Sequence, residues 1–355
     1  MEKKFKKIGI LTSGGDAPGM NAVIKSVTCA AIDHGLEVVG VIGGYAGLLY
    51  DNTRTLTEND VSGIVSKGGT MLYSERCKEY NSKEGVAKAA KYCRDKGIDG
   101  IVAIGGDGTF RGANDLSNSG IPCIGVTGTI DNDITASDIT VGYDTAMNTA
   151  VRLCDSLRDT FESHSRCVVV QVMGRDAGYI AIETGLAVNA IGVAIKEKEF
   201  DKEALFNRMI ERKRQGQKGF IVVVSEGCGD DFAPQLTKEI EEKTGIVSRF
   251  VSPEHILRGG TPTLADRNFA SRSGYKAVEL LLQGVSDVVV CSRHDRIVPF
   301  EINFAIALDA MYKNKLKDGD LDKFTKEQIA EMEAICEERR AYFDEMYEIV
   351  NAIGC

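Results

Sequence analysis

The sequence predicts an α/β protein in which mainly parallel sheets are covered by helices. Short apolar runs alternate with segments of helical periodicity along almost the whole chain, which is typical of strand–helix–strand units. Several of these runs end in loops rich in glycine and aspartate, and ligands of open α/β folds bind where strands end and loops begin. The 355 residues are enough for two domains.

In the first half of the chain, glycines separate apolar runs from helical patterns. Met20, Val23, Ile24 and Val27 follow a 3.6-residue period, and this helix is expected to stop at Gly35. The predicted strands are 8–11, 38–42, 98–104 and 123–126, and the other predicted helices are 57–66 and 82–96.

The second half continues the alternation and ends in a charged helical segment. A long amphipathic helix is expected from 143 to 161, near the entry to a second domain. Further strands are predicted at 168–172, 220–224 and 288–291, and helices up to 244 and at 266–282. Near the end, an apolar helical stripe over 325–350 is interrupted by Arg339, and we expect this stripe to pack on its own or a neighbouring subunit.

The amino-acid composition argues against several classes of protein. The net charge of −9 argues against a nucleic-acid or membrane-surface protein. No apolar stretch reaches the ~20 residues of a membrane helix, and the apolar run after the basic N-terminus is too short for a signal peptide. The ten cysteines form no CxxC pair and the four histidines have no zinc spacing, so we expect reduced thiols in a cytoplasmic protein.

Two loops of similar design indicate a phosphate site. SGGDAPG at 13–19 and GGDGT at 105–109 each lie between a predicted strand and a helix, where glycines let backbone N–H groups approach a phosphate. Asp107 in the second loop can bind Mg²⁺. A tight turn without a ligand is the alternative for either loop alone, and GGDGT is neither a Walker A motif nor a dinucleotide fingerprint.

The stretch PCIGVTGTIDND at 122–133 places Asp131 and Asp133 directly after a predicted buried strand. Carboxylates at such a position can hold a metal or accept a proton, although Asx-rich turns are common there too. Arg175 follows a predicted strand, Arg76 follows GGTMLYSE, and Arg258 lies in HILRGG beside His255. Phosphoryl transfer needs positive charge of this kind. Each arginine alone is more often a surface residue.

Together these motifs resemble 6-phosphofructokinase of the bacterial type. The resemblance rests on LTSGGDAPGMN, GGT..YSER, IGGDGT, GTIDND, SHSR, VMGR, SEG and H..RGGTP in this order, from about residue 7 to 296. It implies two three-layer α/β domains: 1–138 plus about 257–306 for the nucleotide, and 139–256 plus about 307–355 for the sugar phosphate, with a C-terminal helical extension. It also implies a cytoplasmic kinase of glycolysis.

The resemblance assigns roles residue by residue. Asp131 matches the base for the sugar 1-hydroxyl, Asp133 and Thr129 assist it, and Arg175 steadies the transferring phosphoryl group. The nucleotide positions match Gly15, Arg76, Cys77, Gly106, Asp107, Gly108 and Thr109, with Asp107 linked to Mg²⁺. The sugar-phosphate positions match Thr129, Ile130, Asp131, Met173, Gly174, Arg175, Glu226, His255, Arg258, Arg166 and Arg249. The last two come from a neighbouring subunit in that family, which implies a homotetramer or dimer.

Several alternatives stay open. Relatives that use pyrophosphate typically carry aspartate and lysine where this chain has Gly108 and Gly128, which favours ATP. Sedoheptulose 7-phosphate shares the reacting end of fructose 6-phosphate and is an alternative acceptor. A silent regulatory paralogue is disfavoured by the intact aspartates, and an NAD-linked dehydrogenase by the missing GxGxxG loop.

The effector pocket of regulated relatives carries arginines that are largely missing here. The matching positions are Lys25, Cys29, Glu58, Gln215, Gln217 and Lys218, with Arg158 retained. Lysine lacks the bidentate fork of arginine, and cysteine and glutamine carry no charge. We therefore expect weak or altered control by ADP and phosphoenolpyruvate.

Overall fold

The computed structural model describes residues 5–354; residues 1–4 and 355, at the outer ends of the predicted domains, lie outside this range. The chain forms two compact units. Unit 1 comprises the described part of Met1–Ile130 together with Ile134–Asp144 and Arg258–Cys336. Unit 2 comprises Asp131–Asp133, Thr145–Leu257 and the described part of Glu337–Cys355.

Unit 1 is built on a sheet whose described strands run in the order β11-β10-β5-β4-β1-β2-β3. The strands are β1 (Lys7–Thr12), β2 (Glu37–Val41), β3 (Thr53–Leu56), β4 (Gly100–Gly105), β5 (Cys123–Thr127), β10 (Val288–Arg293) and β11 (Arg296–Glu301). The five central strands are parallel, whereas β3 and β11 pair antiparallel at the two edges. Strands β4 and β5 are buried throughout, as their continuous apolar sequences predict.

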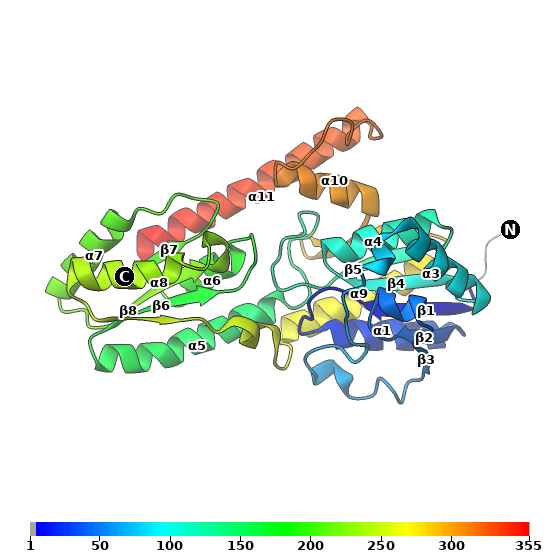
Figure 1. The fold of residues 1–355 in the computed structure, drawn as a ribbon, viewed down its shortest axis with the longest axis horizontal. Helices are drawn as coiled ribbons and strands as arrows, with labels where there is room; N and C mark the ends of the chain where they lie inside the picture. The colour runs from blue at the N-terminus through cyan, green and yellow to red at the C-terminus, as the bar shows by residue number, and fades with distance from the viewer. Residues whose placement is uncertain (1–4, 355) are drawn as a thin grey trace. The chain divides into compact units, whose positions relative to one another are not determined.

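Helices cover both faces of this sheet (Figure 1). They are α1 (Met20–Asp33), α2 (Tyr45–Leu49), α3 (Lys83–Asp95), α4 (Asp107–Asn118), α9 (Leu264–Leu282) and α10 (Ile302–Tyr312). The connections β1–α1–β2 and β4–α4–β5 run in opposite directions along the sheet, so right-handed crossovers place α1 and α4 on opposite faces. Helix α9 packs against α1, while α3, α4 and α10 share one apolar cluster.

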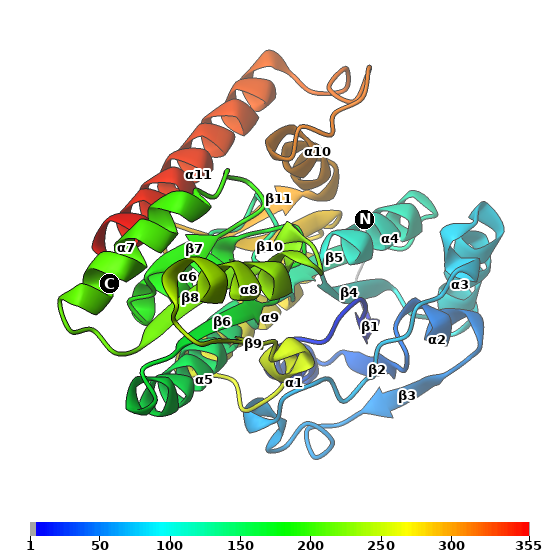
Figure 2. The ribbon, with the colours of Figure 1, turned by 60° about the vertical axis from the view of Figure 1, so that its left-hand side comes forward.

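Unit 2 contains a parallel sheet with the strand order β7-β8-β6-β9. Its strands are β6 (Cys167–Val172), β7 (Gly192–Ala194), β8 (Phe220–Ser225) and β9 (Ser248–Val251). Its helices are α5 (Tyr143–Ser163), which begins in unit 1, α6 (Tyr179–Ala187), α7 (Lys202–Arg214) and α8 (Phe232–Thr244). Helices α7 and α8 accompany this sheet (Figure 2), and their apolar side chains form one core cluster with β6 and β8.

The C-terminal helix α11 (Lys326–Ile353) contributes to both units. Met332, Ile335 and Cys336 of its first half belong to the apolar cluster of unit 1, together with Leu308 of α10. Residues 307–336 therefore belong to unit 1, whereas the sequence analysis assigned them to the sugar-phosphate domain. The other domain limits stay a prediction.

The α/β class with mainly parallel sheets is confirmed, but the helix predicted over 57–66 is wrong. Only a 3₁₀ turn at Ile64–Ser66 forms there. The Asp60 carboxylate accepts hydrogen bonds from the backbone N–H and hydroxyl of Thr57, which closes a local turn, and Gly63 then adopts φ 73°. Four strands at sheet edges, β3, β7, β9 and β11, were not predicted from the sequence.

Candidate active site

The two glycine loops of unit 1 are tied directly to each other. SGGDAPG connects β1 to α1, and GGDGT connects β4 to α4. The Thr109 hydroxyl donates to the Ser13 carbonyl at 3.0 Å, and the Ser13 N–H donates to the Ile104 carbonyl, also at 3.0 Å. A Cβ atom on Gly105 would lie 2.3 Å from the Ser13 oxygen, so only glycine fits between the loops. The two predicted phosphate loops thus form one cradle.

The N-terminus of α4 presents a polar, partly open surface beside this cradle. Asp107 is its first residue and forms an ion pair with Arg111 at 3.0 Å. Gly106 precedes it as the N-cap, and Gly108 is exposed, with nothing within 4 Å of the position that a Cβ atom would take. The first N–H groups of the helix and its positive dipole end favour an anion here.

The predicted residue Arg258 and the YSER segment both contact the SGGDAPG loop within unit 1. The guanidinium Nη1 of Arg258 lies 3.4 Å from the Asp16 carbonyl, and a Cβ atom on Gly15 would approach this nitrogen to 2.7 Å. Ser74 donates to the Gly14 carbonyl at 2.5 Å and so holds the YSER segment, which ends at Arg76 and is followed by Cys77. Arg258, expected at the sugar 6-phosphate, therefore lies beside the SGGDAPG loop, which was expected to hold the nucleotide. His255 belongs to unit 2 and is exposed.

The TIDND segment is buried at its centre. Thr129 belongs to unit 1, where its N–H donates to the Val141 carbonyl at 3.1 Å and its carbonyl accepts from Thr140 at 2.7 Å. Asp131 is only 6% exposed and Asn132 only 4%, and Asn132 has φ 50°. Non-glycine residues rarely adopt positive φ, although asparagine tolerates it best, so this loop has a specified backbone shape.

The MGR turn in unit 2 is held by a distant carboxylate. Oε1 of Glu226 accepts the backbone N–H groups of Gly174 at 3.0 Å and Arg175 at 2.5 Å. Both residues have positive φ, 143° for Gly174 and 57° for Arg175. A residue such as arginine is held in this region only when its surroundings require it. Glu226, expected to contact the sugar, therefore also sets the shape of the turn that follows Met173.

A second carboxylate supports the same segment. Glu197 accepts the Gly178 N–H at 2.8 Å. Although the residue as a whole is exposed, desolvation of its carboxyl group by the surrounding protein raises the pKa of this group. Asp176 and Lys196 form an ion pair at the exposed edge. Arg175 itself is exposed.

Arg166 and Arg249 lie at the other end of the same sheet. Arg166 directly precedes β6, whereas Arg175 follows it, and Arg249 pairs with Val168 near the start of β6. A strand rises ~3.3 Å per residue, so the six residues of β6 separate the two ends by about 20 Å. Arg249 is exposed and lies 3.8 Å from the Glu241 carboxylate.

Comparison with known protein families identifies the family to which this chain belongs. The phosphofructokinase family profile matches residues 7–281, more than half of the chain. The chain belongs to the phosphofructokinase family. The resemblance inferred from the motifs is thereby confirmed, and the dehydrogenase alternative is excluded.

Curated bacterial phosphofructokinases are similar to this chain over most of its length. The ATP-dependent 6-phosphofructokinase of Halothermothrix orenii is 44% identical over 330 residues, 90% of this chain and 98% of that protein. The ATP-dependent 6-phosphofructokinase of Halalkalibacterium halodurans is 46% identical over 298 residues, 84% of this chain and 93% of that protein.

Solved phosphofructokinases share the fold. The Saccharomyces cerevisiae enzyme superposes with a TM-score of 0.82 at 28% identity over 93% of this chain, which spans only half the length of that yeast chain. A pyrophosphate-dependent phosphofructokinase from Marinobacter aquaeolei gives a TM-score of 0.76 at 22% identity, over 84% of this chain and 83% of that one. At this identity the second likeness shows the fold alone.

Proposed function

We propose that this chain is an ATP-dependent 6-phosphofructokinase that transfers the γ-phosphoryl group of ATP to the 1-hydroxyl of fructose 6-phosphate, the committed step of glycolysis in the cytoplasm. The observation that carries this proposal is family membership together with an unbroken set of motif residues. Asp131, Asp133 and Arg175 are all present, and the curated relatives at 44–46% identity are named for this activity.

Asp131 accepts the proton of the 1-hydroxyl as its oxygen attacks the γ-phosphorus. The bond from this phosphorus to the β–γ bridging oxygen breaks, and ADP leaves with the bond electrons. Arg175 offsets the charge of the transferring group, while Thr129 and Asp133 support the base. Phosphoryl transfer depends mainly on positioning and electrostatics, and the specified backbone of both loops supports these assignments.

The nucleotide is assigned to the cradle between the two glycine loops. Its phosphates meet backbone N–H groups of the loops and of the first turn of α4. Mg²⁺ is usually held by one or two carboxylates together with phosphate oxygens, and Asp107 offers one such carboxylate beside the open space at Gly108. When bound, Mg²⁺ neutralises charge on the phosphates. No cluster of three or more His, Cys, Asp or Glu suited to a metal occurs among residues 5–354, which fits a metal that arrives with the nucleotide.

Gly108 supports ATP as the donor. Its backbone does not require glycine and a side chain would meet open space there, so packing does not explain the residue. An aspartate at this position would extend toward the phosphates and repel them. Gly128 is less informative, because a Cβ atom there would lie 3.1 Å from both Ile104 and Met20, and packing alone favours glycine.

We also propose that the active form is a homo-oligomer, a dimer or a tetramer. Met173, Gly174 and Glu226 belong to one end of the sheet in unit 2, whereas Arg166 and Arg249 belong to the other. One chain cannot bring both sets to the same sugar phosphate across about 20 Å. Mixing an Asp131→Asn variant with an Arg249→Ala variant should restore part of the activity after subunit exchange, and no recovery despite exchange would contradict shared sites.

Steady-state kinetics with a panel of donors and acceptors tests the main proposal. Mg-ATP with fructose 6-phosphate should give the highest kcat/KM. Equal or faster turnover with pyrophosphate would overturn the choice of donor. A higher kcat/KM with sedoheptulose 7-phosphate would overturn the choice of acceptor.

We also propose that ADP and phosphoenolpyruvate control the activity only weakly. The proposal is based on the charged residues that line a pocket in unit 1. This pocket, of about 360 Å³, is lined by Lys25, Cys29, Glu58 and also Asp33. One cation faces two carboxylates, so an anionic effector meets net negative charge at these positions. Arg158 belongs to unit 2, where its guanidinium donates to the Val188 carbonyl and pairs with Glu162 at 3.6 Å.

A further inference from the structure

The C-terminal helix carries one buried cation, Arg339, at the position where its apolar stripe breaks. Its side chain is only 7% exposed, although arginine is almost never fully buried unless it is paired. The residue lies beyond residues 7–281, the part of the chain that the family profile matches. Burial of this charge therefore calls for an explanation within this chain.

Arg339 joins the catalytic loop to the helix that follows the MGR turn. Its Nη2 donates to the Asn132 carbonyl at 2.5 Å, and Asn132 lies between Asp131 and Asp133. Its Nε donates to the Tyr179 hydroxyl at 2.8 Å, and the guanidinium carbon stands 4.8 Å from the centre of the Tyr179 ring. Tyr179 is the first residue of α6. All of these residues belong to unit 2.

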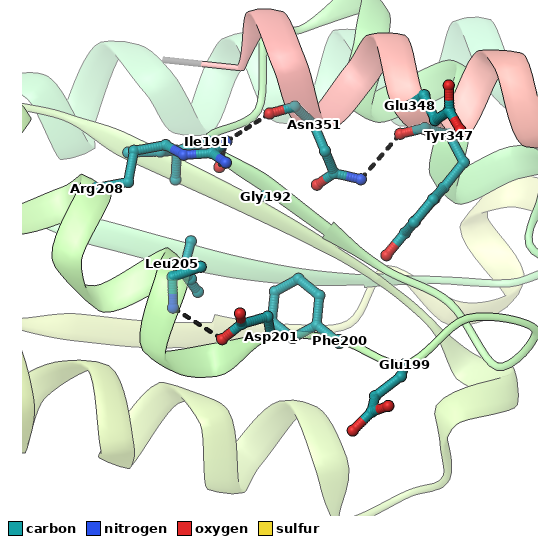
Figure 3. Close-up of a pocket in the computed structure, with 11 residues that line it drawn as sticks. Ile191, Gly192, Glu199, Phe200, Asp201, Leu205, Arg208, Tyr347, Glu348 and Asn351 are labelled. Atoms are coloured by element: carbon teal, nitrogen blue, oxygen red, sulfur yellow. Dashed lines mark hydrogen bonds between the residues drawn. The ribbon is translucent and has the colours of Figure 1, made fainter.

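The second half of α11 is attached to unit 2 by further contacts, so the backbone that carries Arg339 is held in place. Phe343 packs edge-on against Tyr179 with ring centres 5.0 Å apart, and Tyr342 donates to the Glu183 carboxylate at 2.9 Å. At the end of the helix, Arg208 of α7 donates to the Asn351 carbonyl at 2.7 Å and to the Ile191 carbonyl at 3.2 Å (Figure 3).

We propose that Arg339 is a positioning residue that orients the Asp131 loop through the Asn132 carbonyl. Asn132 has φ 50°, so its peptide adopts an orientation that needs support. A charge-assisted hydrogen bond from a stacked guanidinium supplies this support, and a misplacement of ~1 Å in a catalytic group can cost about 10²-fold in rate. The inference rests on the proposed role of Asp131 as the base.

The test compares turnover of Arg339→Met, Arg339→Lys and two controls with the wild-type chain. Arg339→Met should lower kcat by about 10- to 100-fold, while KM for ATP stays within about twofold, because the nucleotide loops belong to unit 1. Arg339→Lys should keep part of the activity, since lysine keeps the charge but not the forked geometry. Guanidinium ion added to Arg339→Ala should raise kcat in a saturable manner and should not raise it in Asp131→Asn.

The controls separate positioning from loss of helix docking or charge. Tyr342→Phe removes a docking hydrogen bond of the same helix, and Arg340→Met removes an exposed charge next to Arg339. Both should keep wild-type kcat, even if Tyr342→Phe lowers the melting temperature. Normal kcat in folded Arg339→Met, or an equal loss in either control, overturns the inference. Inactive wild-type enzyme would instead overturn the proposed function.

Discussion

The proposed phosphate loops of unit 1 and the proposed catalytic loops of unit 2 are held in different ways. SGGDAPG and GGDGT hold each other through Ser13 and Thr109, and glycine permits their close approach. The MGR turn is instead fixed by Glu226, and the peptide of Asn132 by Arg339, both of which are distant in sequence. The first pair of loops is therefore held mainly by contacts between the two loops, with further hydrogen bonds from Ser74 and Arg258. The second pair depends on side chains supplied from elsewhere in the fold.

This difference predicts which substitutions lower kcat and which weaken nucleotide binding. Changes in the supports of the unit 2 loops should lower kcat and leave nucleotide binding largely intact. Changes in the unit 1 loops should act first on the nucleotide or on the fold itself. The predictions below run from the largest expected effect to the smallest.

Asp131→Asn should show the largest difference between its effect on kcat and its effect on nucleotide binding. Removal of the general base should lower kcat by about 10²–10⁴-fold, while the Kd of Mg-ATP changes little, because the glycine loops are untouched. Stopped-flow turnover and equilibrium titration of the nucleotide measure the two effects. Near-normal kcat in the purified variant would contradict the assignment of the base.

Gly108→Asp should act on the nucleotide without damage to the fold. The side chain enters open space, so the melting temperature should stay near that of the wild type. Repulsion of the phosphates should lower kcat/KM for Mg-ATP by roughly 10²-fold, since placing like charges together costs several kcal/mol. Gly105→Ala is the contrasting control, because its Cβ atom would lie 2.2 Å from the Thr109 hydroxyl and should destabilise the loop pair.

Glu226→Gln should loosen the MGR turn. The amide oxygen can still accept a hydrogen bond, but the charge that strengthens the bonds to Gly174 and Arg175 is lost. Charge-assisted hydrogen bonds contribute about 1.5–3 kcal/mol, so kcat/KM for fructose 6-phosphate should fall roughly 10- to 100-fold. KM for ATP serves as the internal control, and a selective rise in it would contradict the separation of the two regions.

The smallest effect concerns regulation through unit 1. Millimolar phosphoenolpyruvate or ADP should change half-saturation by fructose 6-phosphate less than about twofold at fixed Mg-ATP, because Glu58 and Asp33 oppose the charge of Lys25. Saturation curves with and without effector test this. A large shift that disappears in Arg158→Ala would show a working effector site.

The sequence alone determined the strand–loop–helix order around the two glycine loops, SGGDAPG and GGDGT. Glycine spacing and apolar periodicity act over a few residues, so they can be read locally, as for β1, β4 and α1. The family followed from these two loops together with the other motifs, such as GTIDND, VMGR and H..RGGTP. Even the interruption of the C-terminal stripe by Arg339 was visible, although not its cause.

Only the tertiary structure decided which side chains hold the catalytic loops. The apolar residues of 57–66 have helical spacing, yet this segment is not an α-helix. Hydrogen bonds between Thr57 and Asp60 close a turn, and Gly63 adopts a left-handed conformation. Glu226 reaches the MGR turn across more than fifty residues, and Arg339 reaches Asn132 across more than two hundred. Such contacts depend on how strands and helices are packed, and no local pattern in the chain records that packing.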